Sequence, residues 1–100
     1  MIMENGITIQ AVDAVFYDNS LQIKTTTTDP KKELLYAFYI YKTGEKEAVH
    51  KSNYQKFPTY QFEASTPGGY KVKVFAKNKN TNNILTMSSE TVMYRIVKDY

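Results

Sequence analysis

Apolar and polar residues alternate along most of the chain, in short runs that end at turn-forming residues. A period of two places successive side chains on opposite faces of a β-strand. The runs cover residues 7–18, 20–28, 33–45, 45–57, 59–66, 70–77 and 84–97. β-Branched and aromatic residues dominate every window that could otherwise form a helix. The pattern therefore predicts about seven strands and no helix.

The run over 33–45 is the most apolar part of the chain. Its alternate positions form two sets, with Leu35, Ala37, Tyr39 and Tyr41 on one face and Tyr36, Phe38 and Ile40 on the other. Because both sets are apolar or aromatic, we expect both faces to be at least half-buried and the strand to be central. The following run, 45–57, is polar enough for an edge strand and a loop.

Residues 66–83, "TPGGYKVKVFAKNKNTNN", join a Pro-Gly turn to a strictly alternating strand and a polar tip. One face of this strand carries Tyr70, Val72, Val74 and Ala76, and the other carries Lys71, Lys73, Phe75 and Lys77. We expect the first set to face a core. The asparagines of the tip favour a turn.

Seven strands in one hundred residues predict a single all-β domain over 1–100. The expected architecture is an antiparallel β-sandwich of the immunoglobulin or fibronectin-III-like type. A chain of this length can bury roughly two thirds of the surface that its unfolded form exposes, which is enough for one core.

The segment "TPGGYKVKVFAKN" resembles the start of strand F in fibronectin type III and related immunoglobulin-like modules. The resemblance implies that Tyr70 forms a tyrosine corner. Its ring would fill the edge of the core, and its hydroxyl would bond to the backbone a few residues upstream.

Residues 33–92 also resemble the bacterial three-tyrosine module, on the strength of "YAFYIYKTGE" and "YQFEASTPGGY". The three tyrosines would be Tyr36 or Tyr41, then Tyr60, then Tyr70. This immunoglobulin-like family occurs in surface proteins and in periplasmic parts of sensor proteins of carbohydrate-using bacteria. The resemblance implies a non-catalytic accessory module of a larger extracellular, cell-surface or periplasmic protein, with neighbouring domains of the same chain as partners.

Composition limits the other possibilities. The chain has no cysteine, so disulfides and thiolate metal sites are excluded. It has no apolar stretch long enough to span a membrane, and its start lacks the features of a signal peptide, so secretion would need a signal elsewhere. Because "MYRIVKDY" runs to the last residue without a polar tail, we expect the protein to continue.

Candidate catalytic residues are few. His50 is the only histidine and sits in a polar stretch without a glycine-rich elbow, which favours a plain surface position. Glu45 and Glu47 have lysine neighbours that suggest surface ion pairs. The chain contains no phosphate-binding glycine motif, and the asparagine-rich loops favour turns over Ca²⁺ sites. We therefore expect no enzyme activity, no cofactor and no metal.

Surface binding remains. Tyr39, Tyr41, Tyr54 and Tyr94 could stack on sugar rings if their faces are open to solvent, and the alternative is that they pack the core and its edges. Lys71, Lys73, Lys77 and Lys79, with Phe75 among them, could bind an anionic polymer, and the alternative is an ordinary solvated strand face.

The net charge of +3 permits acidic partners but is modest, and we expect no nucleic-acid binding. We expect a role in spacing, domain packing or protein interaction. The alternative is a carbohydrate-binding module that uses exposed tyrosines and the lysine row.

Overall fold

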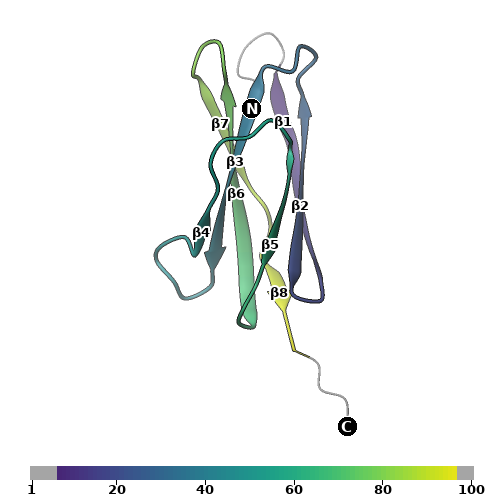
Figure 1. The fold of residues 1–100 in the computed structure, drawn as a ribbon, viewed down its shortest axis with the longest axis vertical. Helices are drawn as coiled ribbons and strands as arrows, with labels where there is room; N and C mark the ends of the chain where they lie inside the picture. The colour runs from purple at the N-terminus through teal and green to yellow at the C-terminus, as the bar shows by residue number, and fades with distance from the viewer. Residues whose placement is uncertain (1–6, 97–100) are drawn as a thin grey trace.

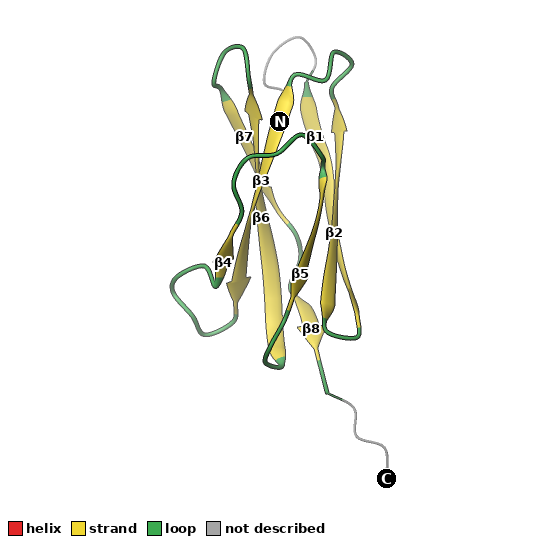
Figure 2. Cartoon of the chain, in the orientation of Figure 1, coloured by secondary structure: helices red, strands yellow, loops and turns green. Residues whose placement is uncertain are grey.

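The computed structural model describes residues 7–96, which contain eight strands and no helix. The strands are β1 (Thr8–Tyr17), β2 (Ser20–Thr28), β3 (Leu34–Lys42), β4 (His50–Lys51), β5 (Thr59–Glu63), β6 (Gly68–Asn78), β7 (Ile84–Ser88) and β8 (Val92–Tyr94) (Figures 1 and 2). The all-β prediction is confirmed. Within this part of the chain, no helix could cross a membrane.

The strands form two antiparallel sheets that pack face to face as a β-sandwich. The three-stranded sheet has the order β1-β2-β5, and the five-stranded sheet has the order β4-β3-β6-β7, with β8 also paired to β6. The chain crosses between the sheets after β2, after β4 and again after β5 (Figure 1). Each sheet pairs strands that are not consecutive in the chain, β2 with β5 and β3 with β6.

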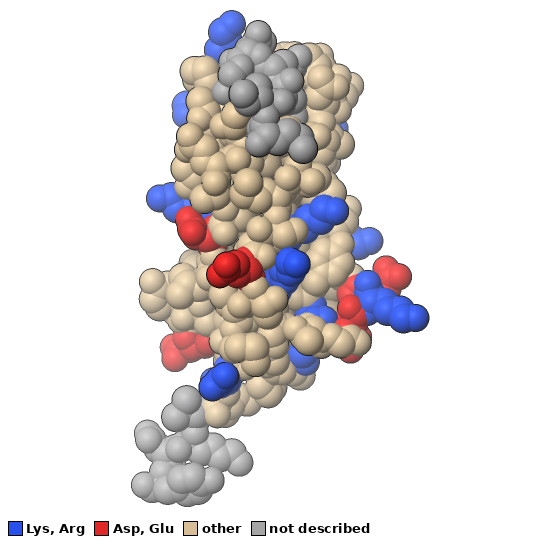
Figure 3. Space-filling model, turned by 180° about the vertical axis from the view of Figure 1, so that it is seen from behind, with Lys and Arg blue, Asp and Glu red and all other residues tan. Residues whose placement is uncertain are grey.

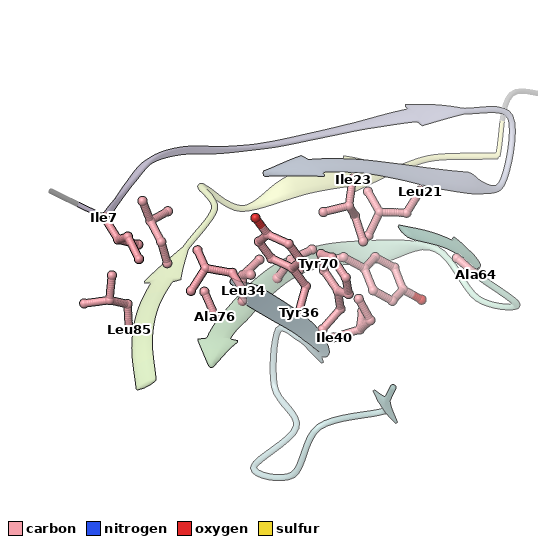
Figure 4. Close-up of a cluster of buried hydrophobic side chains, with 14 residues drawn as sticks. Ile7, Leu21, Ile23, Leu34, Tyr36, Ile40, Ala64, Tyr70, Ala76 and Leu85 are labelled. Carbon is pink, nitrogen blue, oxygen red and sulfur yellow. The ribbon is translucent and has the colours of Figure 1, made fainter. Parts of the chain in front are cut away.

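The core lies between the two sheets. Figure 4 shows Leu21 and Ile23 of β2 facing Tyr36 and Ile40 of β3 across the interior. Phe38, Ile40, Val72 and Val74 are fully buried. Burying one such side chain stabilises the fold by about 1.5–3 kcal/mol, so the alternating pattern is sufficient to fix which face of each strand points inward.

The predicted central strand and the predicted alternating strand are neighbours. β3 pairs with β4 on one side and with β6 on the other, so the prediction that it is central is confirmed. In β6 the expected inward set, Tyr70, Val72, Val74 and Ala76, is buried. The outward set therefore lies on the outer face of the five-stranded sheet.

The last predicted strand, 84–97, is divided in the structure, and the count becomes eight strands instead of seven. β7 and β8 follow one another along the same edge of β6. Between them, the buried Ser89 hydroxyl accepts the N–H of Val72 at 3.0 Å and donates to the carbonyl of Glu90 at 2.9 Å. A side chain thus takes the place of a backbone acceptor, and the regular ladder stops.

Candidate functional site

Tyr70 lies near the start of β6 and anchors the turn that precedes this strand. Its side chain is 2% exposed, and its hydroxyl donates to the backbone carbonyl of Thr66 at 2.5 Å, four residues upstream. The ring meets Phe16 edge-on at a centroid distance of 5.6 Å. The expected backbone hydrogen bond is therefore present. Because Tyr70 points into the core, Lys71 and every second residue after it point outward.

The two glycines before Tyr70 are needed for this turn. Gly68 has a φ of 147°, which side-chain-bearing residues rarely adopt. At Gly69, an added Cβ would lie 2.7 Å from Oγ1 of Thr43 and 3.0 Å from Cγ2 of Thr91. The close approach of these neighbours leaves no room for a side chain.

Antiparallel pairing of β3 with β6 brings the two outward sets together. The facing pairs are Tyr41 and Lys71, Tyr39 and Lys73, Ala37 and Phe75, and Leu35 and Lys77. β4 places Lys51 opposite Tyr39. We call the resulting surface the aromatic–basic face, formed by Tyr39, Tyr41, Tyr54, Phe75, Lys51, Lys71, Lys73 and Lys77. All seven residues predicted as possible ligand contacts lie on it, and Lys51 is an addition that the sequence did not suggest.

Aromatic rings and ammonium groups are in contact on this face. The rings of Tyr39 and Phe75 have centroids 4.6 Å apart. The Nζ of Lys51 lies 5.2 Å from the centroid of Tyr39, and that of Lys73 lies 5.2 Å from Phe75. The Nζ of Lys77 lies 4.7 Å from the Tyr54 centroid. These distances are within the cation–π range of about 6 Å, so three of the four rings carry an ammonium group.

The tyrosine side chains of this face are only partly exposed to solvent. Tyr39 and Tyr41 are half-buried, and Tyr54 is 37% exposed. Burial raises the pKa of the Tyr54 phenol above its ordinary value, and the neighbouring Tyr39 phenol adds to the shift. Tyr94 lies elsewhere and packs against Phe16 at 5.4 Å. Lysine ammonium groups lie over the rings of Tyr39 and Tyr54, on the surfaces where a sugar would stack.

The charge of the face is of one sign. It carries four lysines, and no strand position on it holds a carboxylate in the part of the chain that the structure describes. Figure 3, which views the molecule from the side opposite to that of Figure 1, shows basic and acidic side chains interspersed. The aromatic–basic face is therefore a basic patch.

Two further sequence candidates, besides Tyr94, lie away from this face. His50 was expected at the surface, but it is half-buried between the sheets, where its Nε2 is 2.5 Å from the Tyr60 hydroxyl. The reason is its pairing with Ile40, whose side chain points into the core. Lys79 follows β6 in the turn and does not continue the lysine row.

The asparagine-rich tip is a turn, as predicted. The Asn78 Oδ1 accepts the N–H groups of Asn80 and Thr81, and Asn82 has a φ of 64°. Over residues 7–96, the structure contains no group of three or more His, Asp or Glu that could hold a metal ion.

The outer face of the other sheet carries a shallow depression that sequence reasoning missed. Tyr17 and Phe57 line it and are 65% and 69% exposed. Gln22 of β2 and Gln61 of β5, which pair with one another, also line it. Tyr17 follows Phe16 in an alternating strand, so its outward orientation was readable, but nothing in the sequence indicated that Phe57 would lie nearby.

No protein-family model, curated protein or solved structure matches the chain. The resemblance to the three-tyrosine module therefore stays a prediction, and function is inferred from the geometry of the sheets.

Proposed function

We propose that this domain is a non-catalytic β-sandwich module that acts by binding, and that the aromatic–basic face holds an acidic partner. The observation that carries the proposal is the set of three lysine ammonium groups lying over aromatic rings on a face without acidic strand positions. The rings restrain the lysine side chains before a partner arrives, which lowers the entropy that binding must overcome.

The acidic partner that we favour is a neighbouring domain of the same chain. The resemblance of residues 33–92 to an accessory module of larger bacterial surface, sensor or carbohydrate-handling proteins supports this choice. A sheet face with a pair of packed rings, Tyr39 and Phe75, also suits docking against another folded surface. The surrounding lysines would select an acidic surface.

The second candidate is carbohydrate binding. Tyrosines and lysines share one face, so a glycan held there would carry carboxylate or sulfate groups. A neutral sugar is disfavoured because Lys51 and Lys73 already cover the rings of Tyr39 and Phe75.

Titration with poly-glutamate, dextran sulfate and neutral dextran tests the proposal. The test variant is Lys71→Glu with Lys73→Glu. The matched control is Lys24→Glu with Lys31→Glu, which changes the net charge equally at exposed positions away from the face. We expect salt-sensitive binding of poly-glutamate that falls by about tenfold or more in the test variant and by less than about threefold in the control.

Binding of dextran sulfate without poly-glutamate would favour the glycan candidate. Saturable binding of neutral dextran that Tyr39→Ala or Tyr54→Ala weakens would replace the proposal with a sugar-stacking site. Equal losses in both charge variants, or no binding to any of the three polymers, would contradict it.

A further inference from the structure

A pocket opens near the start of β3. On one side, the pairing of β2 with β5 ends at Lys24 and Thr59, and the N–H of Thr25 bonds to the carbonyl of Pro58 at 2.8 Å. On the other side, Tyr36 pairs with Gln55. The segment between β4 and β5 crosses from one sheet to the other at this point (Figure 1). Beyond it, the connecting segments and the start of β3 line an open pocket of about 610 Å³.

The interior of this pocket is mostly apolar, with one polar spot. Leu34, Leu35 and Pro58 line it, and Phe57 stands at the mouth with 69% of its surface exposed. The buried Tyr36 places its hydroxyl 2.9 Å from that of Thr27, so these two groups satisfy one another. The volume falls within the range of about 300–1,000 Å³ that is usual for small-molecule sites.

The lining of the pocket is rich in positive charge. Lys32, Lys56 and Lys79 line it and are exposed, and they come from three different connections between strands. Asp29 is the only carboxylate among the lining residues. Its two oxygens already accept the N–H groups of Glu33 at 2.8 Å and Leu34 at 3.0 Å. The lining therefore holds three ammonium groups and one carboxylate, and both oxygens of that carboxylate already accept backbone hydrogen bonds.

We propose that this pocket binds a small organic anion with an apolar body, such as a medium-chain carboxylate. The body lies against Leu34, Leu35 and Phe57, and the anionic group is held by Lys56 and Lys79. Apolar walls contribute affinity by burial, and lysines contribute selection for the anion. The site shares none of the eight residues that define the aromatic–basic face, and it adjoins that face where Leu35 pairs with Lys77. Its lysines differ from those of the face, so the two proposals are tested separately.

Amide NMR titration with octanoate tests the site on the full chain. Octanol supplies the same body without charge, and acetate supplies the charge without the body. The test variant is Lys56→Gln with Lys79→Gln, and the matched control is Lys71→Gln with Lys73→Gln on the aromatic–basic face. All four are replaced by an uncharged side chain of similar length, and unchanged spectra of the free variants establish that they are folded.

We expect octanoate to give saturable shifts at Thr27, Leu34 and Leu35, with octanol and acetate binding at least about threefold more weakly. The test variant should lose at least about threefold in octanoate affinity and the control should lose none. Three results would overturn the proposal: no saturable shift with octanoate, equal affinity for octanol, or equal losses in the two variants.

Discussion

The two faces of β6 differ in what fixes their positions. The inner residues, Tyr70, Val72, Val74 and Ala76, are at most 2% exposed and pack against the other sheet. The outer residues, Lys71, Lys73, Phe75 and Lys77, acquire their neighbours from β3 through strand register. Burial alone sets the inner face, whereas the outer face depends on which strand lies alongside. Stability should therefore reside mainly on the inner face, which leaves the outer face available for binding.

The largest effect is expected at Phe38, which lies opposite Val74 on the inner face. Phe38 is fully buried and stacks on Tyr60 at a centroid distance of 5.2 Å. Phe38→Ala should lower the free energy of unfolding by about 3–5 kcal/mol. Urea denaturation measures the loss, with the outer-face variant Phe75→Ala for comparison. If both variants lose a similar free energy of unfolding, the two faces do not differ in their contribution to stability.

Gly69 lies on the outer face, but neighbouring side chains leave too little space for a Cβ. A Cβ there would meet Oγ1 of Thr43, whose N–H is bonded to the Gly69 carbonyl at 2.9 Å, and Sδ of Met93. Gly69→Ala should therefore destabilise the fold by about 1–3 kcal/mol. Lys71→Ala, two residues along the same face, should change the midpoint of chemical denaturation little. A harmless Gly69→Ala variant would show that these neighbours move aside.

Tyr70→Phe tests the corner without changing its packing. Loss of the hydrogen bond to the Thr66 carbonyl should lower the free energy of unfolding by about 0.5–2 kcal/mol. On the outer face, Tyr41→Phe should stay within about 0.5 kcal/mol of the unmodified chain. If equilibrium unfolding gives equal values for the two variants, Tyr70 contributes by packing alone.

The smallest expected effect is on the pH dependence of stability, and it arises from Tyr36 on the inner face of β3. Burial raises the pKa of its phenol, the nearby Asp29 carboxylate raises it further, and the hydrogen bond with Thr27 partly opposes the shift. The folded chain therefore holds this proton more tightly than the unfolded chain does. The resulting stability is present below about pH 10 and is lost as pH rises through the folded-state pKa.

Stability curves measured from neutral to alkaline pH should therefore fall less steeply above about pH 10 for Tyr36→Phe than for the unmodified chain. The comparison uses slopes because the variant also loses the bond to Thr27. Parallel curves would mean that Tyr36 titrates alike in the folded and unfolded states.

The sequence was most informative where one face of a strand is buried. Alternation alone identified the inward residues of β6, since a shift by one residue would bring lysines into the core. In β3 it separated two apolar sets, and the structure shows that Tyr36, Phe38 and Ile40 are the set whose members are all buried. It could not reveal the interruption between β7 and β8, because that depends on a hydrogen bond between Ser89 and the distant Val72.

The candidate surface was predictable in part for the same reason. The outward residues of β3 and β6 were readable as two separate sets, but their union needed the register between these strands. Lys51 joins them only because β4 pairs with β3 at Tyr39. The pocket beside Tyr36 needed the path of the segment between β4 and β5, which no local pattern specifies.

Mapping of amide and lysine side-chain signals during titration with sucrose octasulfate tests the central claim most directly. This small polyanion reports where the surface attracts acidic groups. We predict the largest changes at Lys71, Lys73 and Phe75, smaller ones at Lys51 and Tyr39, and almost none at Gln22 and Gln61 on the opposite sheet. Changes centred on the opposite sheet, or spread evenly over all exposed lysines, would contradict the account.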